Sequence, residues 1–88
     1  MITRTFPRAA MLELLEGASK SLKEVSRALI GKSRWASQHE LIFREGEALY
    51  RAHFETGEEV VPWECETDVV VFRVVPREVT VIKYENIP

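Results

Sequence analysis

The chain has 88 residues, of which 45% are hydrophobic and 30% are charged, and its formal net charge is −2. This composition excludes an intrinsically disordered chain, and the length allows one small hydrophobic core, so we expect a single domain over residues 1–88. The single cysteine, Cys65, excludes an intrachain disulfide, and no segment approaches the roughly 20 apolar residues of a membrane span. We therefore expect a cytoplasmic protein that does not enter a membrane.

The two parts of the chain carry opposite charge. Residues 1–34 contain seven Lys or Arg and three Glu, a net charge of +4, whereas residues 35–88 contain five Lys or Arg and eleven Asp or Glu, a net charge of −6. This asymmetry fits a nucleic-acid surface at one end, head-to-tail self-association, or simply two differently solvated faces.

Residues 8–30 carry the apolar stripe of an amphipathic helix. Its members recur at spacings of three and four: Met11, Leu15, Ala18, Leu22, Val25 and Leu29. Pro7 suits the first helical turn, whereas Gly17 interrupts the stripe, and Ser21 with Glu24 has the spacing of a capping box. The pattern predicts one broken helix or two short helices, and we favour two.

The tripeptide Gly31-Lys32-Ser33 has the letters that end a phosphate-binding P-loop. That motif needs a further glycine five residues earlier, where this chain has Ser26, and it needs a strand before it and a helix after it. Here the expected helix comes before the tripeptide and the expected strand comes after it. We therefore interpret Gly31 as the residue that ends the helix, with Lys32 and Arg34 complementing the negative end of the helix dipole.

From Trp35 onward the apolar period changes to two residues, which predicts strands. The first two form a hairpin: a strand near residues 37–44, a turn at Glu45 and Gly46, and a strand near residues 48–54. Tyr50, Ala52 and Phe54 share one face of the second strand, which we expect to pack against the helices.

Two valine-rich segments, "DVVVFRVV" and "EVTVIKY", predict a second pair of strands, whereas Pro62 places the preceding segment in a loop or at an edge. The fold class is therefore α+β, with a helical layer over residues 1–34 packed on an antiparallel sheet of about four strands over residues 35–88. Long final strands would leave an exposed sheet edge, so we expect a homo-oligomer.

The chain's two tryptophans, Trp35 and Trp63, each stand beside a turn with charged neighbours. A tryptophan in a small domain commonly belongs to the core or its rim. The alternative is that both converge with Arg34 and Glu64 as an exposed binding patch, because Trp and Arg are the usual anchors of interfaces. Tyr50 is a further aromatic candidate for this patch.

The sequence identifies no catalytic residues. His39 and His53, expected to point outward from neighbouring strands, and Cys65 lack the short spacing of a metal site. Acidic neighbours make Cys65 a poor nucleophile, and no motif positions a Ser-His-Asp or Cys-His pair. We expect no enzymatic activity, no metal and no cofactor.

A helix-turn-helix is a competing interpretation of the N-terminal part. "SLKEVSRAL" would be its second helix after a turn at Gly17, with basic residues available to phosphates. The strands that would form a wing are rich in Glu, which the phosphate backbone repels. A winged-helix-like DNA-binding regulator is therefore an alternative, and nucleic acid is not the partner we favour.

The segment from Ser33 onward resembles a group of small proteins encoded by bacteriophages and prophages. The shared features are Ser33-Arg34-Trp35, Phe43, Gly46, Tyr50, Gly57-Glu58, Pro62-Trp63-Glu64, and Val74 through Tyr84. The resemblance implies a phage origin and an infected bacterial host, and it transfers no catalytic residues.

Small phage proteins of this kind commonly act by stoichiometric binding, which implies two possible partners. One is a host protein such as a defence nuclease or polymerase, for whose basic surface the acidic half would compete. The other is a nucleotide-derived defence signal, for which the aromatic residues would stack on the base and Arg34 would pair with phosphate. We expect an anti-defence or host-takeover inhibitor that occludes or sequesters a host factor, and keep the nucleotide sponge as an alternative.

Overall fold

The computed structural model describes residues 2–77 and 84–87. In these residues the chain forms one helix and five strands, which confirms the α+β class. In chain order the elements are β1 (Thr3–Pro7), α1 (Arg8–Leu15), β2 (Leu22–Lys32), β3 (Ser37–Glu45), β4 (Ala48–Thr56) and β5 (Asp68–Val74). Neither β1 nor β2 is predicted from the sequence. Within the described ranges, no helix is long and apolar enough to cross a membrane.

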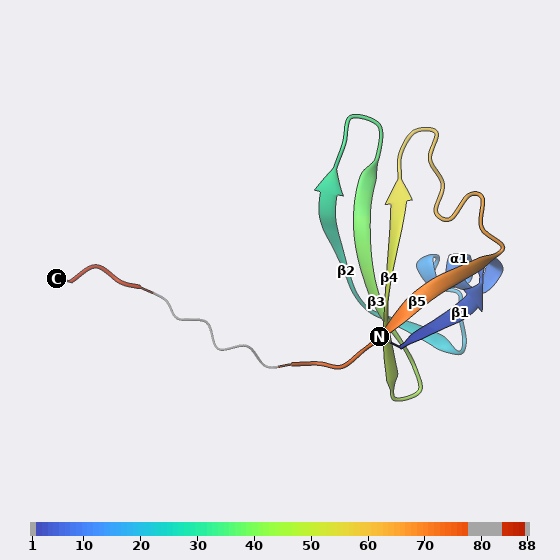
Figure 1. The fold of residues 1–88 in the computed structure, drawn as a ribbon, viewed down its shortest axis with the longest axis horizontal. Coiled ribbons are helices and arrows are strands. Elements are labelled where there is room, and N and C mark those ends of the chain that lie inside the picture. Colours follow the sequence, from blue (N-terminus) through green and yellow to red (C-terminus); the bar gives the residue numbers. More distant parts are fainter. Residues whose placement is uncertain (1, 78–83, 88) are drawn as a thin grey trace.

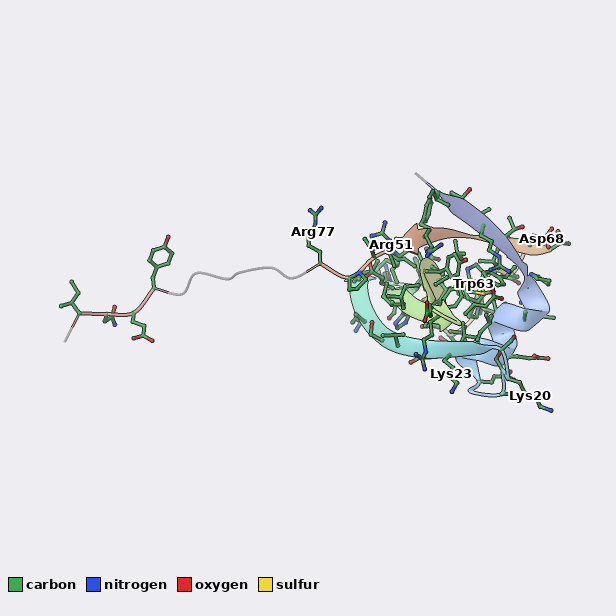
Figure 2. The ribbon with its side chains drawn as sticks, turned by 90° about the horizontal axis from the view of Figure 1, so that it is seen from below. Lys20, Lys23, Arg51, Trp63, Asp68 and Arg77 are labelled. Atoms are coloured by element: carbon green, nitrogen blue, oxygen red, sulfur yellow. The ribbon has the colours of Figure 1, made fainter. Side chains whose placement is uncertain are left out.

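The strands form a single antiparallel sheet in the order β1-β5-β4-β3-β2. Strands β2 to β5 follow one another as a meander, and β1 pairs with the other side of β5 (Figure 1). The sheet curls around the core side chains, while Lys20 and Lys23 point away from it (Figure 2). α1 packs against β1, β2 and β5.

The hairpin of β3 and β4 confirms the prediction for this part of the chain. Its pairing runs from Ser37 opposite Thr56 to Glu45 opposite Ala48. Gly46 has a φ of +61°, a left-handed conformation that glycine adopts without the cost of a Cβ. The face that carries Tyr50 is buried, as the alternation predicts.

The prediction of a second helix in the N-terminal part is wrong, because residues 22–32 form the strand β2. α1 ends at Leu15, Gly17 turns the chain with a φ of +74°, and β2 begins where the hydroxyl of Ser19 accepts a 3.0 Å hydrogen bond from the N–H of Leu22. Gly31 lies within β2 opposite Gln38 and does not end a helix. The helix-turn-helix hypothesis thereby loses its second helix.

Two irregularities in β2 explain why its sequence looked helical. The register shifts between Glu24 and Ser26, and again between Leu29 and Gly31, as β-bulges do. The residues opposite the core-facing positions of β3 are Leu22, Glu24, Arg27 and Leu29, which pair with Glu45, Phe43, Leu41 and His39. These four residues of β2 are therefore two or three positions apart, where a regular strand would keep every second residue on one face. Leu22 and Leu29, seven positions apart, share a face in this bulged strand, and they would also share a face in a helix, where seven residues make two turns.

The core lies between α1 and the concave face of the sheet. Its buried members are Phe6, Met11, Leu14, Leu22, Leu41, Phe43, Tyr50, Ala52, Phe54, Val69 and Val71. Phe6 of β1 meets Phe43 and Tyr50 edge to face, with ring centroids 5.6 and 5.7 Å apart. Arg4 closes this end by donating hydrogen bonds to Glu45 and to the hydroxyl of Tyr50, and the bond to Glu45 is the main cause that raises the pKa of its guanidinium.

The sheet opens between β4 and β5. The two strands pair from Leu49 opposite Val74 to Arg51 opposite Phe72, whereas from Val71 to Asp68 β5 pairs with β1 alone. β4 continues to Thr56, and residues 57–67 cross from its end to the start of β5. This opening is where the candidate site lies.

"DVVVFRVV" forms β5 as predicted, and β5 pairs on its two sides with β1 and β4. The strand expected over "EVTVIKY" lies outside the described residues except for Tyr84. Tyr84 is exposed.

Candidate functional site

The loops 33–36 and 57–67 meet at one end of the sheet, which we call the loop end (Figure 1). Gly57 lies directly against the first loop, since a Cβ added to it would stand 2.5 Å from the carbonyl oxygen of Trp35. No side chain fits there without a backbone shift. The absence of a side chain at Gly57 therefore allows the two loops to touch.

The loop 33–36 is a tight turn that holds Arg34 and Trp35 at its tip. The N–H of Ser33 donates to the carbonyl of Ala36 at 2.8 Å, and the N–H of Ala36 donates to the hydroxyl of Ser33 at 3.1 Å. The guanidinium carbon of Arg34 lies 4.9 Å from the centre of the Trp35 ring. This is within the range of a cation–π contact, which restrains both side chains.

Trp35 is 73% exposed, and three more large apolar side chains are exposed in β2 and in the loop 57–67. They are Leu29 and Ile30 near the end of β2, and Val61 in the loop 57–67. Single exposed apolar residues are common on proteins, whereas neighbouring ones are typical of an interaction surface, and of these four Ile30 and Val61 line a common groove.

Trp63 has the opposite environment, since it is half buried against the core. Its indole Nε1 donates a 2.9 Å hydrogen bond to the backbone carbonyl of His53, and its ring lies 5.6 Å from that of Phe54. The backbone of Trp63 has a φ of +52°, a left-handed conformation that costs a non-glycine residue about 1–2 kcal/mol. The side-chain contacts offset this cost and fix the ring beside the open edge of β4.

The loop around Trp63 forms hydrogen bonds to α1 and between its own backbone groups. Arg8, at the start of α1, donates two hydrogen bonds to the carbonyl of Pro62, at 3.3 Å from Nε and 3.2 Å from Nη2. The N–H of Glu66 donates to the carbonyl of Trp63 at 3.1 Å. Trp63 and the preceding Pro62 are therefore held by hydrogen bonds from α1, from β4 and from within the loop.

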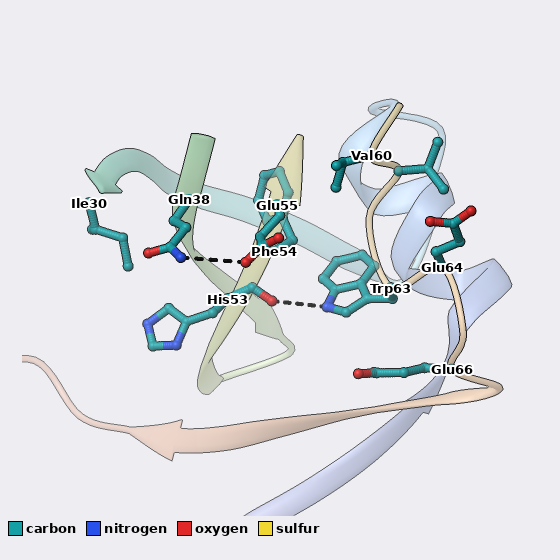
Figure 3. A pocket seen from close by; sticks show the side chains of 10 residues that line it. Ile30, Gln38, His53, Phe54, Glu55, Val60, Trp63, Glu64 and Glu66 are labelled. Carbon is teal, nitrogen blue, oxygen red and sulfur yellow. Dashed lines mark hydrogen bonds between the residues drawn. The ribbon is translucent and has the colours of Figure 1, made fainter. Parts of the chain in front are cut away.

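A groove of about 520 Å³ lies beside Trp63, between the end of β4 and the loop 57–67 (Figure 3). Its lining residues come from β2, β3, β4 and the loop: Ile30, Gln38, His53, Phe54, Glu55, Val60, Val61, Trp63, Glu64 and Glu66. Half of them are apolar or aromatic. The described lining includes three glutamates and no Lys or Arg.

The structure brings some of the predicted site residues together and separates others. Arg34 and Trp35 form one pair at the tip of the loop 33–36, and Trp63 and Glu64 line the groove. Tyr50 is 6% exposed and belongs to the aromatic core with Phe6 and Phe43. The five residues therefore do not form one patch.

The two histidines lie on opposite faces of the sheet, which corrects the expectation that both point outward. His39 pairs with Phe54, stacks on its ring at 4.9 Å, and lies 2.9 Å from the hydroxyl of Thr56. His53 is on the other face, 3.4 Å from Glu40. In residues 2–77 and 84–87, no group of three or more His, Cys, Asp or Glu side chains is placed to hold a metal ion.

Sequence reasoning missed the groove residues Ile30, Glu55 and Val61. Ile30 lies in the stretch that the apolar spacing predicts as a helix, whereas in the structure it is the residue of the bulge between Leu29 and Gly31 in β2. Glu55 directly follows the strand predicted near residues 48–54, and Val61 belongs to the segment that Pro62 places in a loop or at an edge. Its mixture of valines, tryptophan and glutamates was the available signal.

Comparison with protein-family models, with curated proteins and with solved structures finds no match to this chain.

Proposed function

We propose that the protein is a non-enzymatic binding protein that uses the loop end to occlude a host protein. The resemblance to phage-encoded proteins motivates the setting, which is the cytoplasm of an infected bacterium. The observation that carries the proposal is Trp35, which is 73% exposed at the tip of a hydrogen-bonded turn and is covered on one side by Arg34.

Trp and Arg are the residues that most often dominate the binding energy of protein interfaces. A tryptophan presented on a turn loses little conformational freedom when a partner covers it, since the turn already restrains it. Ile30 of β2 and Val61 of the loop 57–67 provide further exposed apolar area, and both line the groove beside Trp63. Together these features favour a protein surface as the partner.

The charge of the loop end supports a partner with a basic surface. The two loops that form the loop end contain four glutamates, all in the loop 57–67, and one cation, Arg34, so their net charge is negative. Negative charge around an apolar anchor accelerates association with a positive surface and disfavours association with a negative one. A nuclease or polymerase surface that normally contacts nucleic acid has this positive character.

The alternatives have less support in the geometry. A nucleotide sponge needs aromatic rings and cations around one cavity, but Tyr50 is in the core and the described lining of the groove is acidic, which disfavours phosphate. A DNA-binding regulator needs a recognition helix, and residues 22–32 form β2.

Self-association is a further part of the proposal. β2 is an 11-residue strand at an edge of the sheet and carries exposed apolar side chains, Val25 among them. An edge of this kind offers N–H and C=O groups for pairing with a second copy. Light scattering is expected to give a mass above the 10.1 kDa of one chain, and a mass equal to 10.1 kDa would contradict this part.

The main test is capture of a host protein from a bacterial lysate on the immobilised chain. We expect the unaltered chain to retain one host protein in stoichiometric amount. Tyr84→Ala is the matched control, because it removes an aromatic side chain that is 92% exposed and lies outside the loop end, and it should retain the same protein. Trp35→Ala is expected to lose it. Equal capture by both variants would contradict the assignment, as would a melting-temperature increase with nucleotides in place of any protein partner.

A further inference from the structure

We infer that the groove beside Trp63 receives a basic side chain, Lys or Arg, from an exposed segment of the partner. This inference rests on the proposed function, because it names the chemistry of the partner at the same end of the sheet. Three features support it: the apolar walls of the groove, the fixed position of the Trp63 ring, and the negative charge of the glutamates in the lining.

The groove combines apolar walls with a negative rim. Ile30, Val60 and Val61 offer aliphatic surface, and Glu55, Glu64 and Glu66 contribute three carboxylates to the same lining (Figure 3). This is the environment that a long cationic side chain requires, since its methylene stem packs on apolar surface while its charged head remains near carboxylates and water.

Among the described residues, no cation forms an ion pair with the carboxylates of the groove. Of the three, Glu55 has a hydrogen bond to a lining residue, a 3.4 Å contact from the amide of Gln38, which leaves its charge in place. No Lys or Arg belongs to the described lining. A cation that enters therefore meets complementary charge, and an anion meets repulsion.

Trp63 adds an aromatic ring at a defined position. Its Nε1–H already donates to the carbonyl of His53, so the indole is held in one orientation by the end of β4. A guanidinium or ammonium above an indole ring gains a cation–π contact, which is strongest for Trp among the aromatic side chains. An uncharged apolar side chain would use the walls but would leave the carboxylates without a partner.

The test uses short peptides, so it does not depend on knowing the host protein. In the Trp35→Phe variant Trp63 is the only tryptophan, and both its fluorescence and its indole N–H resonance report on the groove. The probe is an acetylated and amidated Ala-Arg-Ala-Arg-Ala peptide at low ionic strength, compared with the same peptide carrying Glu in place of Arg. We expect a saturable change at Trp63 with the Arg peptide and none with the Glu peptide.

The charge dependence is tested with matched pairs of substitutions in the same background. Glu64→Gln with Glu66→Gln is expected to weaken binding by about three- to tenfold, as two exposed carboxylates at a rim would. Glu13→Gln with Glu47→Gln removes the same charge at exposed positions outside the groove and is expected to leave the affinity within about twofold.

Binding of the Glu peptide as tight as that of the Arg peptide would overturn the inference, as would an equal effect of both charge pairs or the absence of any saturable change at Trp63. These outcomes are separable from failure of the proposed function. Capture of a host protein that depends on Trp35 without peptide binding removes the groove inference alone. Peptide binding without Trp35-dependent capture removes the proposed function and leaves the groove as a site for basic side chains.

Discussion

The indole of Trp63 donates a 2.9 Å hydrogen bond to the backbone carbonyl of His53. His53 lies beyond Arg51, the last residue of β4 that pairs with β5, so a side chain from the loop 57–67 satisfies a carbonyl at the open edge of the sheet. The bond joins the loop to the sheet and thereby forms one wall of the groove.

Replacing Trp63 tests this bond directly. Trp63→Phe keeps an aromatic ring against Phe54 but removes the donor, and we expect the free energy of unfolding to fall by about 1–2 kcal/mol in urea titrations. Trp35→Phe is the control, because its side chain is 73% exposed, and it should change stability by less than about 0.5 kcal/mol. Equal effects of the two substitutions would refute the role assigned to the Trp63 bond.

Gly57→Ala tests the contact between the two loops. Its Cβ would meet the carbonyl oxygen of Trp35 at 2.5 Å, so we expect a loss of about 1–3 kcal/mol in stability and shifted amide resonances at Trp35 and Ala36. Gly17→Ala is the comparison, since no atom lies within 4 Å of its added Cβ and its cost comes from a φ of +74°. The resonances of Trp35 and Ala36 should be unaffected in Gly17→Ala.

Ala28→Thr distinguishes a strand from a helix in residues 22–32. Ala28 is exposed in β2, and threonine is favoured in strands but disfavoured in helices. The substitution should leave the unfolding midpoint unchanged or raise it. A loss of more than about 0.5 kcal/mol is the result that a helix would produce.

Met11→Ala tests how firmly α1 is anchored to the sheet. Met11 is fully buried, and its truncation is expected to lower the free energy of unfolding by about 2–5 kcal/mol. Glu13→Ala, an exposed position on the same helix, should stay within about 0.5 kcal/mol. Similar small losses at both positions would mean that α1 does not hold the core as described.

The fold class, the start of α1 at Arg8, the hairpin of β3 and β4 and the strand β5 were accessible from the sequence. In each case the apolar residues follow one period, or one residue marks a turn. The alternation along β4 predicts that Phe54 is buried, and Gly46 marks the turn between β3 and β4. β2 was not accessible, because its bulges break the period of two at Val25 and Ile30. β1 is five residues long, and its identity depends on pairing with β5, which lies far along the chain.

The candidate site could be predicted by residue type but not by arrangement. The sequence marks both Trp35 and Trp63 as candidates, yet one is exposed on a turn and the other is fixed beside β4. Tyr50 is a candidate for the same patch by residue type, although the alternation along its strand predicts that it faces the core, where the structure places it. The contact of Gly57 with Trp35 joins two distant loops and leaves no local signal in either.

The most direct test of the binding function is a calorimetric titration of the isolated host protein with the unaltered chain and with Trp35→Ala. We expect saturation at a fixed stoichiometry with the unaltered chain and an affinity reduced by about 30-fold or more in Trp35→Ala, as for an interface hot spot that contributes at least about 2 kcal/mol. Both chains should unfold at the same urea concentration. An unchanged affinity in a folded Trp35→Ala variant would contradict the proposal that Trp35 at the loop end binds the partner.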